Sequence, residues 1–282
     1  MQRALVAVVL VSLVGAVVGT FVIHKGLAFI GDAVAHSSLA GVATAFVLGG
    51  NVFLGALAWA VPAAVLMGYV SRRGRLNLDA AIGIVFAGGF ALGILIISRV
   101  PNYTVDLFSF VFGNVLGVSP GDLAIVAVVA LGILLLVGLF FKELLFSAYD
   151  PTMAAASGIP VGLVQYALLT MVALTVVVSL KTVGVVLVVA LLITPPATAA
   201  LLARRFPRIM ALAAVFGLAS AVLGLYLSYY ANLASGAAIV LIATGFFLLA
   251  FLFAPGRGLL VARRRPPAAS PPGAAPTPGA GS

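Results

Sequence analysis

The sequence contains no cysteine and very little charge. Only six of its 282 residues are acidic, and charged residues of both signs make up 7% of the chain, whereas an ordinary soluble domain has about a quarter. The missing cysteines exclude disulfides, thiol nucleophiles and thiolate metal sites. The scarcity of charge excludes a soluble globular enzyme, because so few ionisable groups could not cover the surface of a water-soluble core.

The sequence consists mainly of long hydrophobic runs. Hydrophobic residues make up 64% of the chain, and several runs reach the roughly 20 residues that cross a bilayer as a helix. Candidate spans run approximately over 4–23, 27–48, 52–70, 79–98, 121–141, 161–180, 182–203, 208–230 and 234–254. Nine spans would place the N-terminus outside, and Arg3, ahead of the first run, argues against this, so eight spans stay open as the alternative. We therefore predict an all-α polytopic membrane protein with eight to nine transmembrane helices, whose membrane domain covers residues 1–255.

The basic residues gather in short clusters between apolar runs. They are Arg72, Arg73 and Arg75, then Arg204, Arg205 and Arg208, and finally Arg263, Arg264 and Arg265. Such clusters are typical of cytoplasmic connections and differ from the dense patches of nucleic-acid-binding proteins. We predict a multi-pass protein of the cytoplasmic (inner) membrane with a cytoplasmic C-terminus and no nucleic-acid partner. Residues 256–282, rich in Pro, Ala and Gly, are predicted to be a disordered tail.

Two ionisable residues lie inside the second apolar run. Asp32 and His36 are four positions apart and therefore share one face of a helix. Ionisable side chains in a span are costly and usually face a pathway or a partner, and a carboxylate with an imidazole suits divalent manganese, zinc or iron. We predict that both bind metal; the alternative is that they pair only with each other or with neighbouring helices. Ala33, Ser37 and Gly41 form a small-residue stripe that favours close helix packing.

Asp79 opens the fourth predicted span, directly after an arginine cluster. One interpretation is that its carboxylate supplies a third oxygen ligand to the metal. The other is that it stabilises the start of a helix through a cap and the helix dipole. The sequence leaves both open.

The connection 141–160, the longest internal one on the predicted cytoplasmic side, is predicted to contain a short helix. Asp150 can cap a helix whose first residue is Pro151, the alanines around Ala154 favour helix, and Gly158 can end it. This helix carries little apolar surface, so we predict that it contacts another protein on the cytoplasmic side. The alternative is an amphipathic helix that rests on the membrane surface.

Sequence motifs of ATP-binding and zinc-dependent enzymes are missing. No lysine follows a glycine, which excludes a Walker P-loop, and the HExxH zinc motif is absent. We expect a chain that is not an enzyme and binds no cofactor permanently. Any ATP hydrolysis would take place in a partner subunit.

Five stretches of the sequence resemble the membrane-spanning permeases of ABC importers for manganese, zinc and iron ions. They are 31–33 with His36 and Gly41, 79–86, 106–107 with 112–116, 150–151 with Ala154 and Gly158, and 181–184 with 194–195. These stretches keep their order over most of residues 4–254. Ser38, Ala40 and Pro196 depart from the family pattern.

The resemblance implies a fold similar to the vitamin B12 and siderophore importers, with two permease copies. It implies a cytoplasmic ATP-binding subunit and an extracytoplasmic metal-binding protein as partners. Asp32 and His36 fall on positions that contact the ion, Asp79 matches a family aspartate, and 150–158 falls on the coupling helix that docks the ATPase. Within that helix the matching residues are Asp150, Pro151, Ala154 and Gly158.

The implied function is import of Mn²⁺ or Zn²⁺, with iron as a further candidate, by alternating access. Two alternatives stay open at this point. One is an ion-coupled secondary metal transporter, which would favour more buried ionisable residues and inverted repeats. The other is a siderophore- or vitamin-type ABC permease.

Overall fold

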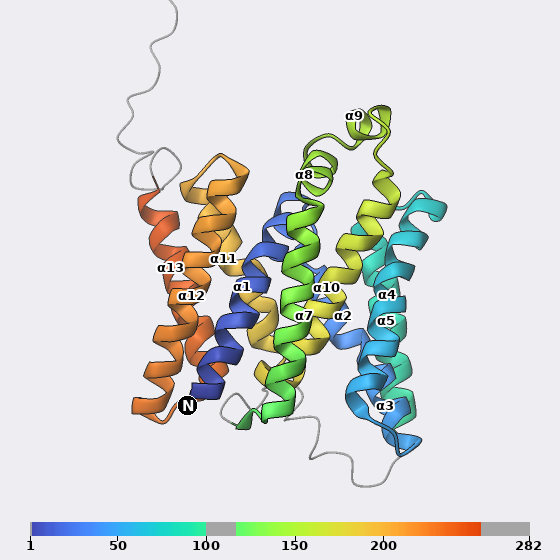
Figure 1. Cartoon of the computed structure of the whole chain (residues 1–282). Helices are drawn as coiled ribbons and strands as arrows, with labels where there is room; N and C mark the ends of the chain where they lie inside the picture. The colour runs from blue at the N-terminus through green and yellow to red at the C-terminus, as the bar shows by residue number, and fades with distance from the viewer. Residues whose placement is uncertain (1, 100–116, 255–282) are drawn as a thin grey trace, which may run out of the picture.

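The computed structural model of the chain describes residues 2–99 and 117–254, and no β-strand occurs in these ranges. The helices are α1 (Gln2–His24), α2 (Ile30–Ser37), α3 (Leu39–Val47), α4 (Val52–Gly74), α5 (Leu78–Ile97), α7 (Pro120–Leu139), α8 (Phe141–Tyr149), α9 (Pro151–Ala156), α10 (Val161–Val183), α11 (Val185–Leu202), α12 (Phe206–Ala231) and α13 (Ser235–Phe253) (Figure 1). Nine described segments, with α2 and α3 counted as one, are long and apolar enough to cross a membrane. The predicted all-α fold is confirmed, with the upper of the two predicted numbers of spans.

Some predictions fall outside the described residues. They concern the tail at 256–282, the arginines at 263–265, and the family stretches 106–107 and 112–116. The predicted division of the chain at residue 255 stays a prediction.

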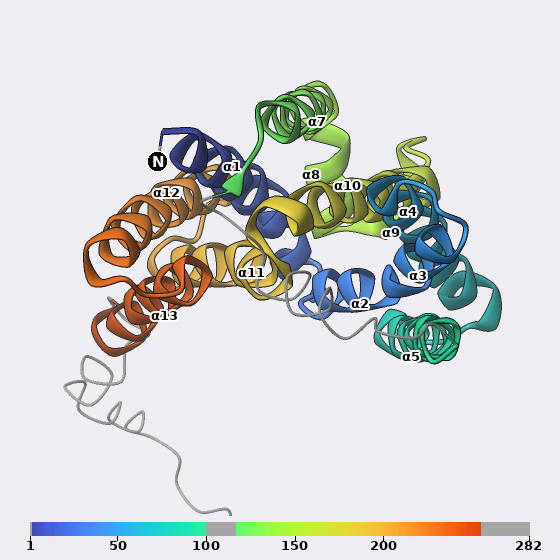
Figure 2. The ribbon, with the colours of Figure 1, turned by 90° about the horizontal axis from the view of Figure 1, so that it is seen from below.

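The spans differ in how deeply they are buried. The first span, α1, and the second, α2 with α3, are the most buried, followed by α10 and α11, whereas α5, α7 and α13 are the least buried. Viewed along the bundle, α10 and α11 lie inside, and α12, α13, α7, α4 and α5 lie around them (Figure 2). The core therefore consists of the helices that pack between the outer spans.

The two ends of the bundle carry different connections. The α4–α5 connection, the α11–α12 connection and the helices α8 and α9 lie at the upper end in Figure 1, whereas the N-terminus and the α3–α4 and α12–α13 connections lie at the lower end. The upper end includes the first two predicted arginine clusters, at 72–75 and 204–208. We call it the arginine end.

Several helices begin where a side-chain oxygen caps the first turn. The Oδ1 atom of Asn51 accepts a hydrogen bond from the Phe53 N–H at 2.9 Å at the start of α4. At the start of α7, the Ser119 Oγ accepts from the Asp122 N–H at 3.2 Å and donates to Asp122 Oδ2 at 2.7 Å. These bonds satisfy N–H groups that have no partner inside the helix.

The second span is broken, although its sequence predicts one helix over 27–48. The helix α2 ends at Ser37 and α3 begins at Leu39. Around the break, the hydroxyls of Ser37 and Ser38 donate to the carbonyls of Val34 and Ala35, at 3.1 and 2.6 Å. Serine hydroxyls that bond back to the preceding turn bend helices, so two adjacent serines explain a break that contains neither glycine nor proline.

Glycines bring the second span against its neighbour α4. A Cβ atom built on Gly41 of α3 would lie 2.6 Å from the Trp59 Cβ and would collide with the Gly55 carbonyl oxygen. Small residues of this kind allow helix backbones to approach closely within a membrane. The predicted packing role of Gly41 is therefore confirmed.

We expect Gly41→Ala to destabilise the protein by roughly 1–3 kcal/mol, because the added methyl group meets backbone atoms that cannot move away. Gly88→Ala on α5 is the matched control, since nothing lies within 4 Å of a Cβ at that position. The measurement is the thermal midpoint at which the detergent-purified protein loses its monodisperse fraction. Equal midpoints for the two variants would contradict the packing role.

Candidate metal site

Asp32 and His36 lie together on α2, whose label stands near mid-height of the bundle in Figure 1. The His36 Nε2 atom is 3.3 Å from the Asp32 Oδ1 atom. The predicted placement of the two side chains on one helix face is thus confirmed. Their role as metal ligands stays a prediction.

The pair faces away from the core. The side chains of Asp32 and His36 are 44% and 34% exposed in the single chain, whereas Ile30, Val34 and Ala35 of the same helix are buried. A carboxylate inside a bilayer costs several kcal/mol, of the order of 3, when it faces lipid. This face of α2 therefore requires water, an ion or another protein chain against it.

Two aromatic rings of α5 hold the imidazole. The His36 ring lies edge-on to Phe90, with centroids 5.6 Å apart, and to Phe86, with centroids 6.0 Å apart. The two phenylalanine rings are themselves stacked. Phe86 and Phe90 are one helical turn apart, so both reach the same neighbour, and they limit the orientations that the imidazole can take.

Glycines allow α5 to come this close. A Cβ on Gly89 would lie 3.0 Å from the Ser37 Cβ, and a Cβ on Gly93 would lie 2.8 Å from the Ala40 N atom. Figure 2 shows α2 and α5 side by side at the margin of the bundle. The metal-ligand candidates on α2 are thus positioned by a helix that contributes rings and glycines.

Asp79 lies apart from this pair. It is exposed in the first turn of α5, at the arginine end, and the Asn77 side chain makes no capping hydrogen bond there. Among the residues described, no group of three or more His, Cys, Asp or Glu could hold a metal ion. A single chain therefore offers two of the three predicted ligands together, and both interpretations of Asp79 stay open.

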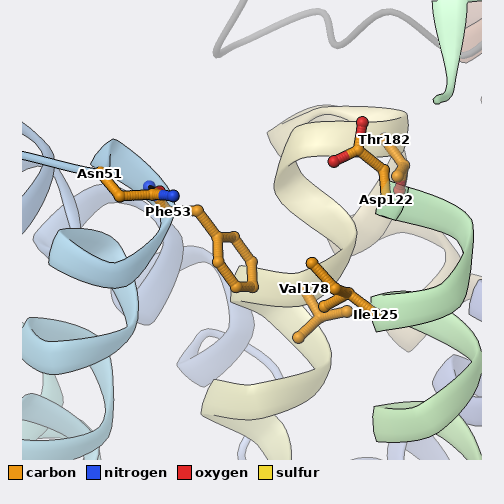
Figure 3. Close-up of a pocket in the computed structure, with 6 residues that line it drawn as sticks. All are labelled: Asn51, Phe53, Asp122, Ile125, Val178 and Thr182. Carbon is orange, nitrogen blue, oxygen red and sulfur yellow. Dashed lines mark hydrogen bonds between the residues drawn. The ribbon is translucent and has the colours of Figure 1, made fainter. Parts of the chain in front are cut away.

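A small pocket lies at the end of the bundle opposite the arginine end, and the sequence analysis did not identify it. It is lined by Asn51, Phe53, Asp122, Ile125, Val178 and Thr182 and has a volume of about 50 Å³. In Figure 3, Asn51 and Asp122 extend from α4 and α7 towards the space between these helices, above the apolar side chains of Phe53, Ile125 and Val178. Asn51 also caps α4, and the Asp122 carboxylate accepts a hydrogen bond from Ser119, the residue that caps α7. The N-termini of α4 and α7 carry partial positive charge, whereas the Asp122 carboxylate and the last turn of α10 carry negative charge, so their effects on an ion in this pocket oppose each other.

The predicted short helix in the long connection is confirmed as α9. The Asp150 Oδ1 atom accepts hydrogen bonds from the N–H groups of Thr152 and Met153, at 3.0 and 2.9 Å, and Pro151 is the first helical residue. Ala154 is buried, and Gly158 follows the helix with a φ of +85°. A left-handed conformation of this kind favours glycine. Figure 1 shows α9 projecting beyond the bundle at the arginine end.

Aromatic rings attach α8, which precedes α9, to the bundle. This aromatic cluster consists of Phe21, His24, Phe141, Tyr149 and Phe206. The rings of His24 and Tyr149 lie 4.3 Å apart, and those of Phe21 and Phe206 lie 4.8 Å apart. Next to the cluster, burial lowers the pKa of the Lys25 ammonium. The start of the α9 region is thus held against α1 and α12.

Comparison with known proteins agrees with these features. Residues 1–254 match the ABC 3 transport family. The manganese transport system membrane protein MntC of Listeria monocytogenes is 46% identical over 265 residues, which cover 94% of each chain. The manganese import system permease protein ScaB of Streptococcus gordonii is 39% identical over 90% of this chain and 91% of the relative.

A solved structure gives the same result. A chain of PsaBC from Streptococcus pneumoniae, solved in complex with a Fab, superposes with a TM-score of 0.81 at 40% identity, over 93% of this chain and 94% of that chain. The predicted resemblance to permeases of metal-ion ABC importers is confirmed. This protein, with its multiple apolar helices and its match over residues 1–254, belongs to the ABC 3 transport family.

Proposed function

We propose that this chain is the permease subunit of an ATP-driven importer of divalent metal ions, with Mn²⁺ as its cargo. The relatives from Listeria monocytogenes and Streptococcus gordonii are both named for manganese transport. The chain contributes oxygen and imidazole ligands and has no thiolate, a donor set that suits manganese. Zn²⁺ and iron accept the same donors, so they are the competing cargoes in the test.

The observation that carries this proposal is the half-exposed Asp32–His36 pair on an apolar bundle. A carboxylate and an imidazole 3.3 Å apart would be costly against lipid. They would be stabilised if the face that bears them lined a path for a cation. A metal ion between them would take the carboxylate oxygen and the imidazole nitrogen as ligands.

Two ligands from one chain do not complete the coordination of Mn²⁺. A second copy, related by a two-fold axis that places the two α2 helices opposite each other, would contribute the same two side chains and cover the exposed face. Four protein ligands at the axis leave room for water. They bind less rigidly than a closed structural site, and a transit site must release its ion.

The connections suggest where the partners bind. Arginine clusters favour the cytoplasmic side, so the arginine end would face the cytoplasm, with α9 as the coupling helix that meets a cytoplasmic ATPase. The opposite end would receive the ion from an extracytoplasmic metal-binding protein. ATP binding would then move α9 and switch the pathway between its outward- and inward-open states.

We expect Asp32→Asn and His36→Gln each to lower Mn²⁺ uptake at least about tenfold. Loss of a residue that only supports a ligand already lowers metal affinity or activity about tenfold, and loss of the ligand itself should lower it more. The assay measures cellular manganese, zinc and iron in a strain that lacks its own importers and expresses the complete transporter. Ser220→Ala on α12 is the control, because the Ser220 hydroxyl donates to the Phe216 carbonyl of its own helix, away from the α2–α5 contact. Normal uptake by correctly inserted Asp32→Asn would remove the site assignment.

Asp79→Asn separates the two interpretations of that residue. If Asp79 is a metal ligand, Asp79→Asn should lower Mn²⁺ uptake as much as Asp32→Asn does. A residue that stabilises the start of α5 would change stability by only about 0.3–1 kcal/mol and leave uptake intact.

Uptake that survives ATP depletion and stops when the proton gradient collapses would contradict the ATP-driven proposal as a whole.

We expect Gly158→Val to weaken binding of the ATPase subunit, because a non-glycine residue in the left-handed region costs roughly 1–2 kcal/mol and would shift the end of α9. Gly49→Val is the control: Gly49 has a φ of +65° and, like Gly158, has nothing within 4 Å of its added Cβ, but it lies in the α3–α4 connection. Co-purification of the ATPase is measured for both. Equal recovery with the two variants would count against α9 as the docking helix.

A further inference from the structure

Arg72 makes a specific contact with α10, although its cluster was predicted only to set the orientation of the chain. Its Cζ atom lies 5.8 Å from the centroid of the Tyr166 ring. A Cβ built on Gly162 would lie 2.6 Å from the same Cζ atom and would collide with the guanidinium. The guanidinium therefore occupies space that only a glycine at position 162 leaves open.

The contact continues one helical turn earlier on α4. A Cβ on Gly68 would lie 3.0 Å from Cε1 of Tyr166 and 2.7 Å from Cδ1 of Leu169. The Tyr166 ring thus packs against the α4 backbone at Gly68 and also contacts the Arg72 guanidinium. We call the group of Gly68, Arg72, Gly162 and Tyr166 the Arg72 contact.

The other arginines of this connection differ from Arg72. Arg73 shares the last turn of α4 with Arg72, yet no ring or ionic partner of its side chain is found among the described residues. A charge that only sets orientation needs no such partner, because it acts from anywhere in the connection. Orientation therefore accounts for Arg73 but not for the fitted position of Arg72.

The Arg72 contact lies directly after the α9 segment. The helix α10 begins at Val161, three residues beyond Gly158. On the other side of α9, the aromatic cluster attaches α8 to α1 and α12. The α9 segment is consequently attached at both ends, and the Arg72 contact is the part of the α4–α10 interface that lies nearest to α9.

From α4, contacts lead on to the candidate metal site. The backbones of α4 and α3 meet at Gly55 and Gly41. At the arginine end, α4 is connected to α5. The Phe86 and Phe90 rings of α5 contact the His36 ring of α2. A movement shared by α10 and α4 would therefore reach the helices on both sides of His36.

We propose that Arg72, seated over Tyr166 in the space left by Gly162, is a positioning residue that makes α4 move together with the start of α10 when α9 is displaced. This inference rests on the proposed function, since the ATPase partner is what displaces α9. Arg72 touches no transported ion. Its role is to keep ATP hydrolysis and movement of the metal-site helices in step.

Three variants separate this role from the effect of charge. Arg72→Gln removes both the charge and the contact. Gly162→Ala keeps the charge but displaces the guanidinium, which moves easily because it is the far end of a flexible side chain. Arg73→Gln is the matched control, since it removes one charge from the same helical turn without removing the contact.

The experiment measures Mn²⁺ ions transported per ATP hydrolysed by the complete transporter in proteoliposomes, with its ATPase and binding protein. We expect Arg72→Gln and Gly162→Ala to lower this ratio roughly two- to fivefold, as the loss of a partly exposed cation–π contact implies. Arg73→Gln should retain the wild-type ratio. Co-purification of the ATPase should be unchanged in all three, because α9 itself is intact.

Two results would overturn the inference. One is a wild-type ratio in Gly162→Ala and Arg72→Gln; the other is an equal decrease in Arg72→Gln and Arg73→Gln, which would assign the effect to charge alone. A double-mutant cycle of Arg72→Gln with Tyr166→Leu, read as the thermal midpoint of the permease without partners, tests the contact independently. Additive midpoints would also overturn it. A wild-type complex without ATP-dependent Mn²⁺ uptake would instead contradict the proposed function, and the inference with it.

Discussion

The high free energy of a charged group in lipid is the constraint on which the rest of this structure depends. The nine apolar spans of the described chain leave few places where a carboxylate can lie at low cost. Asp79 and Asp150 lie at the arginine end of the bundle, and the Asp150 carboxylate caps α9. Asp32 lies in the second span, half-exposed, and His36 is its one ionic partner among the residues that the structure describes. Its position makes functional sense only if something polar covers that face, and the proposed ion pathway with a second copy of the chain would supply this cover.

Close backbone contacts at glycine connect this pair to the rest of the bundle. Gly89 brings α5 to α2, Gly93 brings it to α3, Gly41 and Gly55 join α3 to α4, and Gly162 admits the Arg72 guanidinium at α10. Without a hydrophobic driving force between helices in lipid, such close packing is the main source of specific association. The glycines that bring α5 close to the imidazole and the glycine that admits the Arg72 guanidinium therefore share one purpose, which is to leave room for a close approach.

Local features could be predicted from the sequence because they depend on spacing along one helix. The spans, the shared face of Asp32 and His36, and the cap of Asp150 on α9 are of this type. The break at Ser38 was not predicted, because serine back-bonding competes only weakly with helix propensity and leaves no strong signal. The rings of Phe86 and Phe90 were visible as an apolar pair one turn apart, but which neighbour they would contact depends on how α5 packs.

Arg72 shows most clearly what each level of information decides. Composition and charge distribution alone determined that this is a polytopic helical protein, and they placed Arg72 with Arg73 and Arg75 in one connection, because hydropathy and charge act through the sum of neighbouring residues. Only the tertiary structure distinguished Arg72 from Arg73, by bringing Gly162 and Tyr166, some ninety positions further along the chain, against one guanidinium and not the other. Packing between helices depends on which side chains meet across an interface, and a linear pattern does not contain that information.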